Sequence, residues 1–185
     1  MEETYSYDIE CDTKVFFTSD THFWHRRILE YESVNRPFKD VVDMNEQLIS
    51  RWNSVVGTND LVFHLGDFAF GGQDKIRDLV SRLNGKIVLL LGNHDRDRSK
   101  DWWMSVGFHD VISEPIVFED RFILSHEPMG GIEIPEQIPD GKINLYGHVH
   151  GSDFFNTIDH NRMCVCVERW NCTPIQFDYI RKCFP

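Results

Sequence analysis

The chain has 185 residues and a formal net charge of −11, with 41% hydrophobic and 26% charged residues. These proportions are ordinary for a globular protein, and we expect one domain over residues 1–185 with a sizeable core. The negative charge argues against a broad electrostatic grip on duplex DNA or RNA, and no apolar run approaches the roughly 20 residues of a membrane-spanning helix. Neither duplex nucleic acid nor a membrane is therefore expected as a partner, and the oligomeric state stays open.

The N-terminus and the cysteines indicate the compartment. The stretch MEETYSYDIECD, which includes Cys11, is acidic and lacks the apolar core of a signal peptide. The five cysteines form no CxxC pair, and Cys164 and Cys166 have the spacing of small core residues on one face of a strand. We therefore expect a cytoplasmic protein with reduced thiols.

In the first half of the chain, predicted strands alternate with predicted helices. The strands are short apolar runs, over residues 14–18, 60–68 and 86–91. Between them, apolar residues recur at helical spacing over residues 40–56 and 76–83. Asp40 is the expected N-cap of the first of these helices, because its side chain can accept hydrogen bonds from the first turn.

The second half is predicted to consist mainly of strands. They cover residues 115–120, 121–126, 142–148, 163–170 and 174–180, with a tight turn at 119–121. The Gly- and Pro-rich segment 129–142 shows no period and is expected to be a loop, which could be a lid or a plain surface excursion. The order of elements predicts an α/β fold with a mixed sheet, or with two sheets packed face to face between helices.

Polar side chains occur at the ends of five of these strands. They are Asp20 and His22, Asp67, Asn93 and His94, His126, and His148 and His150. Ligands of α/β sheets bind at the carboxyl ends of the strands, so these groups are expected to converge. Two carboxylates, one amide and five imidazoles suit Mn²⁺, Fe, Zn²⁺, Co²⁺ or Ni²⁺. The set suffices for two ions about 3.5–4 Å apart that share a carboxylate.

The order of these motifs is the most specific feature of the sequence. They read DTH (20–22), GD (66–67), GNHD (92–95), SH (125–126) and GHVH (147–150). This series resembles that of the calcineurin-like metallophosphoesterase superfamily, and the compact length is similar to its small phage and bacterial branch. The resemblance implies a two-sheet mixed β-sandwich flanked by helices, with the metals on loops at one edge.

The resemblance also implies roles for individual residues. Asp20, His22 and His150 would hold one divalent metal, Asn93, His126 and His148 the other, and Asp67 would bridge the two. Mn²⁺ is the first expectation for both ions, with Fe, Zn²⁺, Ni²⁺ or Co²⁺ as alternatives. His94 would face the scissile phosphate as a catalytic residue, and Asp95 would orient its ring.

These roles predict a metal-dependent phosphoesterase for a small, nucleotide-like phosphodiester or phosphomonoester. Two divalent cations exceed the charge of the two carboxylates and a bridging hydroxide, so the site stays positive and attracts phosphate. The hydroxide would attack phosphorus in line. Two alternatives stay open. One is a nuclease on short single strands, and the other is a non-catalytic protein-binding scaffold, which predicts lost ligands although every motif position is kept.

Four further residues are candidates for contact with the substrate. They are His25, Arg26, Arg27 and Arg96. The first three could instead form the exposed first turn of a helix. His64 is expected in the core or behind a ligand, and the aromatic residues Trp102, Trp103 and Phe108 are expected to pack a helix rather than stack on a base.

Overall fold

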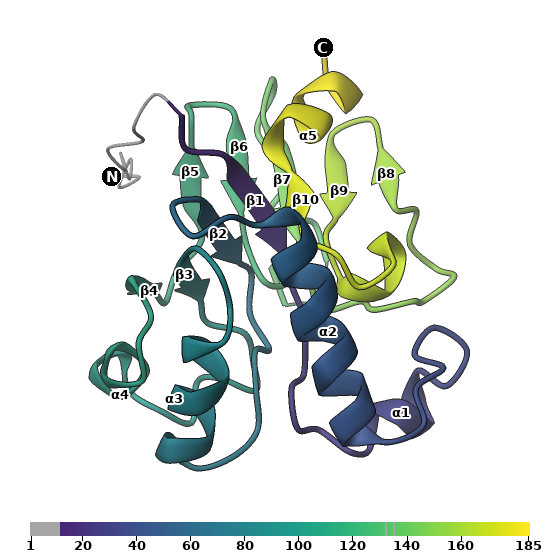
Figure 1. Cartoon of the computed structure of the whole chain (residues 1–185). Helices are drawn as coiled ribbons and strands as arrows, with labels where there is room; N and C mark the ends of the chain where they lie inside the picture. The colour runs from purple at the N-terminus through teal and green to yellow at the C-terminus, as the bar shows by residue number, and fades with distance from the viewer. Residues whose placement is uncertain (1–11, 132, 135) are drawn as a thin grey trace.

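A computed structural model describes residues 12–131, 133–134 and 136–185. Two five-stranded sheets lie at its centre, with strand orders β10-β1-β2-β3-β4 and β5-β6-β7-β9-β8, and helices α2 and α3 lie in front of the first sheet in Figure 1. The predicted α/β fold, with two mixed sheets flanked by helices, is confirmed. Residues 1–11, on which the expectation of no signal peptide rests, lie outside the described residues, and the one-domain expectation stays a prediction.

The first sheet is parallel apart from its edge strand β10. It contains β1 (Val15–Thr18), β2 (Leu61–His64), β3 (Lys86–Leu90), β4 (Asp110–Ile112) and the antiparallel β10 (Ile175–Gln176). Strands β1 and β2 are buried along their whole length, as the apolar runs predicted. Because parallel strands point the same way, the carboxyl ends of β1, β2 and β3 meet at one edge.

Helices cover one face of this sheet. They are α1 (Ile28–Tyr31), α2 (Val41–Val55), α3 (Gln73–Ser81) and α4 (Lys100–Ser105). Asp40 is the N-cap of α2, as predicted, and its carboxylate accepts from the backbone N–H groups of Val42 and Asp43. Apolar side chains of α2 and α3, such as Trp52 and Ile76, form one core with Phe16 of β1.

The second sheet has its own parallel centre. It contains β5 (Ile116–Phe118), β6 (Phe122–Leu124), β7 (Ile143–Tyr146), β8 (Ile158–Asp159) and β9 (Arg162–Cys164), of which β6, β7 and β9 are parallel neighbours. The predicted tight turn joins β5 to β6, with Glu119 and Asp120 at φ of 48° and 53°. Phe118 pairs with Phe122, so the loop has three residues, and the positive φ of the first two lets the chain reverse direction tightly.

Alternation along the strands builds the core between the two sheets. Phe17 and Phe63 of the first sheet and Leu124 and Leu145 of the second belong to one buried cluster. Phe16, the neighbour of Phe17, points to the helices instead. Each sheet therefore buries a face against the other, which brings the carboxyl ends of both sets of parallel strands to a common edge (Figure 1).

The last two predicted strands are largely wrong. Strand β9 ends at Cys164 and a 3₁₀ helix covers Val167–Trp170, while only Ile175–Gln176 pairs as a strand before α5 (Phe177–Cys183). Phe177 and Ile180 are buried while the residues between them are exposed, which is helical spacing. The stretch is too short for its sequence to distinguish the helical period from the two-residue alternation of a strand. Packing against the sheet determines that it is a helix.

Two expectations about composition can be compared with the described residues. Cys164 and Cys166 are buried and free, as expected of small core residues, and the described Cys172 and Cys183 are also free. Cys11 lies outside the described residues. None of the helices in the described ranges has the length and apolar character needed to cross a bilayer.

Candidate metal centre

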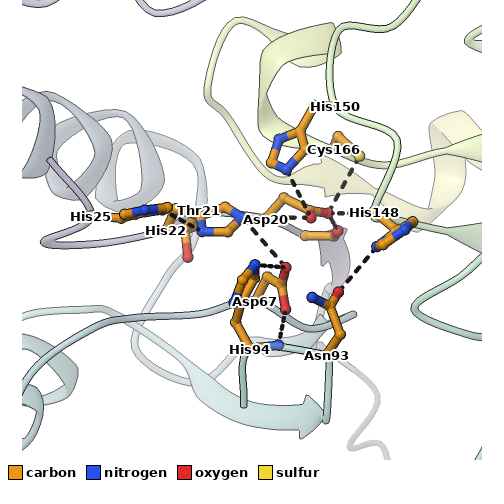
Figure 2. A network of polar contacts seen from close by, with 12 residues as sticks. Asp20, Thr21, His22, His25, Asp67, Asn93, His94, His148, His150 and Cys166 are labelled. Carbon is orange, nitrogen blue, oxygen red and sulfur yellow. Dashed lines mark hydrogen bonds and ion pairs between the residues drawn. The ribbon is translucent and has the colours of Figure 1, made fainter. Parts of the chain in front are cut away.

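The loops at the common edge of the sheets carry the polar motifs (Figure 2). The first sheet contributes four of the predicted ligands, and the second contributes three. Asp20, His22, Asp67 and Asn93 follow β1, β2 and β3, while His126, His148 and His150 follow β6 and β7. The convergence expected from the sequence is therefore present, although the two sheets and not one sheet supply it.

Asp20, His22 and His150 form the first donor group. Their ligand atoms lie within 4.8 Å of one another, with His150 Nε2 3.6 Å and His22 Nε2 3.9 Å from Asp20 Oδ1. Asp20 Oδ1 and His22 Nε2 are buried and have no hydrogen-bond partner among the described residues. Buried polar atoms are normally satisfied, and a cation between these atoms would satisfy both.

Asn93, His126 and His148 form the second donor group. Asn93 Oδ1 lies 2.9 Å from His126 Nε2 and 3.0 Å from His148 Nδ1, and these two nitrogens are 3.3 Å apart. An amide oxygen and two imidazole nitrogens so close together can share either a proton or a cation. The chemistry of this neutral donor set fits a borderline divalent metal.

Asp67 lies between the two donor groups. Its Oδ2 is 3.4 Å from His22 Nε2, and its Oδ1 is 3.6 Å from His126 Nε2. Asp67 also forms a possible metal-holding set with Asp20 and His126. One carboxylate therefore presents an oxygen to each group, which is the arrangement that a bridging ligand requires.

The backbone at the centre is held in an uncommon conformation. Asp20, His22, Asp67, His148 and His150 have φ values of 57°, 48°, 57°, 69° and 49°. Left-handed backbone at residues other than Gly is uncommon and persists where the surroundings enforce it, often at functional sites. Its recurrence at five predicted ligands indicates that the fold holds their side chains toward one point at the expense of local strain.

Two motif glycines allow the loops to approach each other. A Cβ on Gly92 would collide with the carboxylate and backbone nitrogen of Asp67, and a Cβ on Gly147 would collide with Ser19 and the Asp20 carboxylate. Any side chain at either position would displace a predicted ligand. The glycines of GNHD and GHVH are thus explained by close approach of backbone to ligand.

Two imidazoles are oriented from behind. His126 Nδ1 lies 2.7 Å from the carbonyl oxygen of Leu65, and His150 Nδ1 lies 2.9 Å from Glu168 Oε1. A carbonyl only accepts, so the Nδ1–H of His126 donates to Leu65, and the His150 Nδ1–H donates to the Glu168 carboxylate. Each ring therefore turns Nε2 toward the centre, as metal-ligating histidines commonly do.

Sequence reasoning missed Glu168 and its partner Arg36. Their side chains are fully buried and form an ion pair of 2.6 Å although 132 positions separate them in the chain. Neither residue belongs to a motif or follows a predicted strand end. In the sequence, Glu168 is a charged residue that follows a Cys- and Val-rich stretch, and Arg36 precedes a proline. Neither feature is specific enough to predict a buried ion pair.

Burial makes the bare donor set electrostatically unfavourable. It raises the pKa of Asp20 well above its usual range and that of Asp67 to about 6, because a desolvated carboxylate resists ionisation. It lowers the pKa of His22, and that of His126 to about 3, for the same reason. His22 and His126 are therefore neutral donors. Burial also acts against the charged form of His150, but the hydrogen bond to Glu168 and the charge of Asp20 outweigh it and raise the pKa of His150 to about 9. Divalent cations would compensate the two carboxylates and displace the proton of His150.

His94 differs in position from its neighbour Asn93. Its side chain is 46% exposed and its Nε2 lies 4.0 Å from Asp67 Oδ2, with its ring beside those of His22 and Phe70. The backbone N–H of His94 donates to Asp67 Oδ1 over 2.9 Å. The imidazole is therefore partly exposed and lies beside the carboxylate of Asp67 (Figure 2).

The expected contact of Asp95 with the His94 ring is wrong. Asp95 is fully buried, and its oxygens accept from the backbone N–H groups of Asp67, Gly92 and Phe68 at 2.6, 3.0 and 3.1 Å. The His94 ring is not among the partners of Asp95 in the described part of the chain. Asp95 instead ties the loop after β2 to the loop after β3, because its side chain turns inward between them.

The candidate substrate contacts separate into two kinds. Arg26 and Arg27 are exposed at the start of α1, as the alternative reading predicted, and Arg27 lies over the ring of Tyr31. His25 is half-buried, with its Nδ1 3.2 Å from His22 Nδ1 and its ring stacked on Phe70. His25 therefore contacts the predicted ligand His22, and Arg26 is exposed to solvent.

Arg96 borders a cavity of about 710 Å³ beside His126. Its guanidinium donates to the buried Glu127 over 3.2 Å. Described residues of segment 129–142, such as Met129 and Ile134, also line this cavity. The segment has no helix or extended strand among its described residues, as predicted, and it forms a wall of the space next to the centre.

The remaining candidates belong to the core. His64 is fully buried, and its Nε2 lies 2.9 Å from the hydroxyl oxygen of Thr21, which itself donates to the carbonyl of Phe68. Trp103 and Phe108 are buried in the helix-side core, with Trp102 packed against it. Packing, and not base stacking, explains these aromatic residues.

Comparison with known proteins gives the family. The sequence matches the model of the calcineurin-like phosphoesterases over residues 13–164. This match, together with the motif geometry, shows that the chain belongs to the calcineurin-like phosphoesterase family, as the motif series indicated. The family suggests hydrolysis of phosphate esters, and the two donor sets that could hold a metal ion fit its use of divalent metals.

Similar proteins come from an archaeon, a phage and a bacterium. An uncharacterized protein of Methanocaldococcus jannaschii is 35% identical over 175 residues, covering 91% of this chain and 90% of that protein. The Gene 66 protein of Mycobacterium phage L5 is 29% identical over 185 residues, covering 85% and 88%. The crystal structure of a protein of unknown function from Aquifex aeolicus has a TM-score of 0.70 at 25% identity, covering 92% of this chain and 99% of that one.

Proposed function

We propose that this protein hydrolyses a small phosphodiester or phosphomonoester with two divalent cations, Mn²⁺ being the first candidate. One observation carries the proposal: Asp67 presents one oxygen to each of two separate donor groups, at 3.4 Å from His22 and 3.6 Å from His126. Such a pair of sites exceeds what a single structural metal needs. It suits the two-cation clamp that many phosphoryl-transfer enzymes use.

The roles of the residues follow from their places. Asp20, His22 and His150 would hold one cation and Asn93, His126 and His148 the other, with Asp67 shared. The cations would supply positive charge to the phosphate oxygens and lower the pKa of a water between them. His94, which is partly exposed, would donate a proton to the leaving oxygen. Asp95 would act on the loops and not on the proton transfer.

Charge and size favour a small substrate. The net charge of −11 opposes the approach of a long polyanion, whereas the cations attract a single phosphate locally. The cavity beside His126 offers about 710 Å³, enough for the organic part of a nucleotide-sized ester. The free thiols of the described cysteines agree with a reducing compartment, and we propose the cytoplasm.

A substrate panel tests the proposal. Metal-stripped protein would be supplied with Mn²⁺ and assayed on nitrophenyl monoesters and diesters, cyclic nucleotides, dinucleotides, short single strands and duplex DNA. We expect Mn²⁺-dependent hydrolysis of the small esters, lost in Asp20→Ala and retained in Glu46→Ala, which alters an exposed carboxylate on α2.

Two results of that panel would contradict the proposal. Preferred cleavage of short single strands, or efficient cleavage of duplex DNA at physiological salt, lost in Asp20→Ala in either case, would make the protein a nuclease. Failure to hydrolyse any ester with both metals bound would support the non-catalytic scaffold instead.

A further inference from the structure

A buried ion pair lies directly behind one half of the proposed metal centre. Arg36, from the segment between α1 and α2, and Glu168, from the 3₁₀ helix Val167–Trp170, have fully buried side chains. Their N···O distances are 2.6 Å from the terminal Nη2 and 2.8 Å from Nε. A buried ion pair often stabilises a protein no more than apolar packing does. Stability alone therefore does not explain this pair, and its contacts indicate another role.

The pair contacts the first donor group at two points. Glu168 Oε1 accepts the Nδ1–H of His150 over 2.9 Å. Arg36 donates to the carbonyl oxygen of Thr21 over 2.9 Å and to that of Asp20, which fixes the loop carrying Asp20 and His22. All three members of the first donor group are thus positioned by one ion pair.

The second donor group has a neutral support. His126 donates its Nδ1–H to the backbone carbonyl of Leu65 over 2.7 Å, and its partner Asn93 carries no charge. A carboxylate behind an imidazole makes the ring a stronger electron donor than a carbonyl does, and fixes its orientation. The first group also contains its own carboxylate, Asp20. The first group therefore has a carboxylate among its own donors and a second carboxylate hydrogen-bonded to one of its imidazoles, whereas Asn93, His126 and His148 include no carboxylate and His126 is supported by a carbonyl.

We propose that Glu168, held by Arg36, is a positioning residue that makes the Asp20–His22–His150 group the tighter cation site and the first to fill. This inference rests on the proposed function, because it requires cations at the centre. Loss of the Glu168 charge should weaken one cation site selectively. Removal of such a support behind a ligating histidine typically lowers metal affinity by about 10–100-fold.

The test is a calorimetric titration of metal-stripped protein with Mn²⁺. We expect the wild-type protein to bind two Mn²⁺ in a tighter and a weaker class. Glu168→Gln should weaken the tighter class by about 10–100-fold and leave the weaker class unchanged. His150→Ala and His148→Ala assign the classes, since each removes a ligand from only one group, and the class weakened by Glu168→Gln should be the His150 class.

Two variants separate positioning from folding. Asp60→Asn alters another buried carboxylate, which accepts from the backbone N–H groups of Lys14 and Gly57 at the far end of β2, and it should leave both Mn²⁺ affinities unchanged. Because Glu168→Gln leaves Arg36 unpaired, the double variant Arg36→Met/Glu168→Gln removes both charges. It should fold and still show the selective loss.

The outcomes distinguish this inference from the proposed function. Wild-type affinities in both Glu168 variants, or equal weakening of both classes, would overturn the inference and leave the proposed function intact. Absence of Mn²⁺ binding by the wild-type protein would overturn both.

Discussion

The two sheets contribute different chemistry to the centre. The loops of the first sheet carry both carboxylates, Asp20 and Asp67, together with the amide of Asn93 and the imidazoles of His22 and His94, whereas the proposed ligands from the second sheet are imidazoles alone. Burial lowers the pKa of His126 and His148, so these imidazoles of the second sheet bring no charge to the interface. The negative charge of the proposed ligands therefore belongs to one sheet, and the other contributes imidazoles alone.

This difference teaches how the site depends on the fold. Neither sheet alone carries a complete donor set, because each donor group contains residues from both sheets. The proposed cations would therefore link the sheets at their common edge, in addition to the apolar core between them. A substitution that removes this metal link should lower catalysis, metal affinity and stability together. A substitution that leaves the link intact should change only one of these properties.

The largest effect is expected from the residue that faces both groups. Asp67→Ala should abolish hydrolysis and lower the bound metal, because it removes the shared carboxylate and leaves two cations repelling each other. Metal analysis and steady-state kinetics on the purified variant measure both effects. Near-normal turnover with two bound ions would break the account.

A catalytic loss without metal loss is expected at His94. His94→Asn should lower kcat by about 10²–10⁴-fold, the usual effect of a lost general acid, while both ions stay bound. The loss should be smaller for a nitrophenyl ester than for an alkyl ester, because nitrophenolate leaves without protonation. Loss of an ion alongside activity, or unchanged turnover, would show that His94 has another role.

Metal removal tests the link between the sheets. The metal-stripped protein should melt at a lower temperature than the Mn²⁺-loaded protein, because a ligand at 100 times its Kd adds about 2.7 kcal/mol per site to the free energy of unfolding. His126→Ala should reduce this response, since it removes a ligand contributed by the second sheet. Equal melting temperatures with and without Mn²⁺ at saturating occupancy would contradict the link.

The smallest effect concerns a histidine of the first sheet that faces no proposed cation. Burial, with a smaller contribution from His126, lowers the pKa of His64 to about 3, whereas an unfolded histidine titrates near 6.5. The unfolded state then binds one more proton between these values. Stability is therefore complete above about pH 6.5 and is lost as the pH falls, by up to about 1.4 kcal/mol per pH unit.

Substitution of His64 isolates that contribution. His64→Leu in the metal-free protein should flatten the acid side of the stability profile by about one proton, as measured by urea unfolding between about pH 4 and 7. His22 and His126 stay in place and keep part of the slope. An unchanged slope would mean that His64 titrates normally in the folded protein.

The sequence predicted the parts of the molecule that follow local rules. Apolar runs located β1, β2, β3, β6 and β7, and the positions just after them located the donor residues. These signals are readable because a buried parallel strand is apolar throughout and because its last residues fix where the next side chain points.

Other parts depend on contacts that no local pattern records. The apolar residues within 177–180 fit the two-residue period of a strand as well as the 3.6-residue period of a helix. Only packing in the folded protein makes this stretch the start of α5. The motif predicts a contact between Asp95 and the ring of its neighbour, but the side chain of Asp95 turns inward to three backbone N–H groups. Glu168 pairs with Arg36, which lies 132 positions away in the sequence. The role of Glu168 can therefore be recognised only from the folded structure.

A crystal structure with bound Mn²⁺ and anomalous scattering data tests the central claim most directly. The account predicts two anomalous peaks about 3.5–4 Å apart on either side of Asp67. One should lie among Asp20, His22 and His150, and the other among Asn93, His126 and His148. A single peak, or none, at a Mn²⁺ concentration that supports hydrolysis would contradict the two-cation centre.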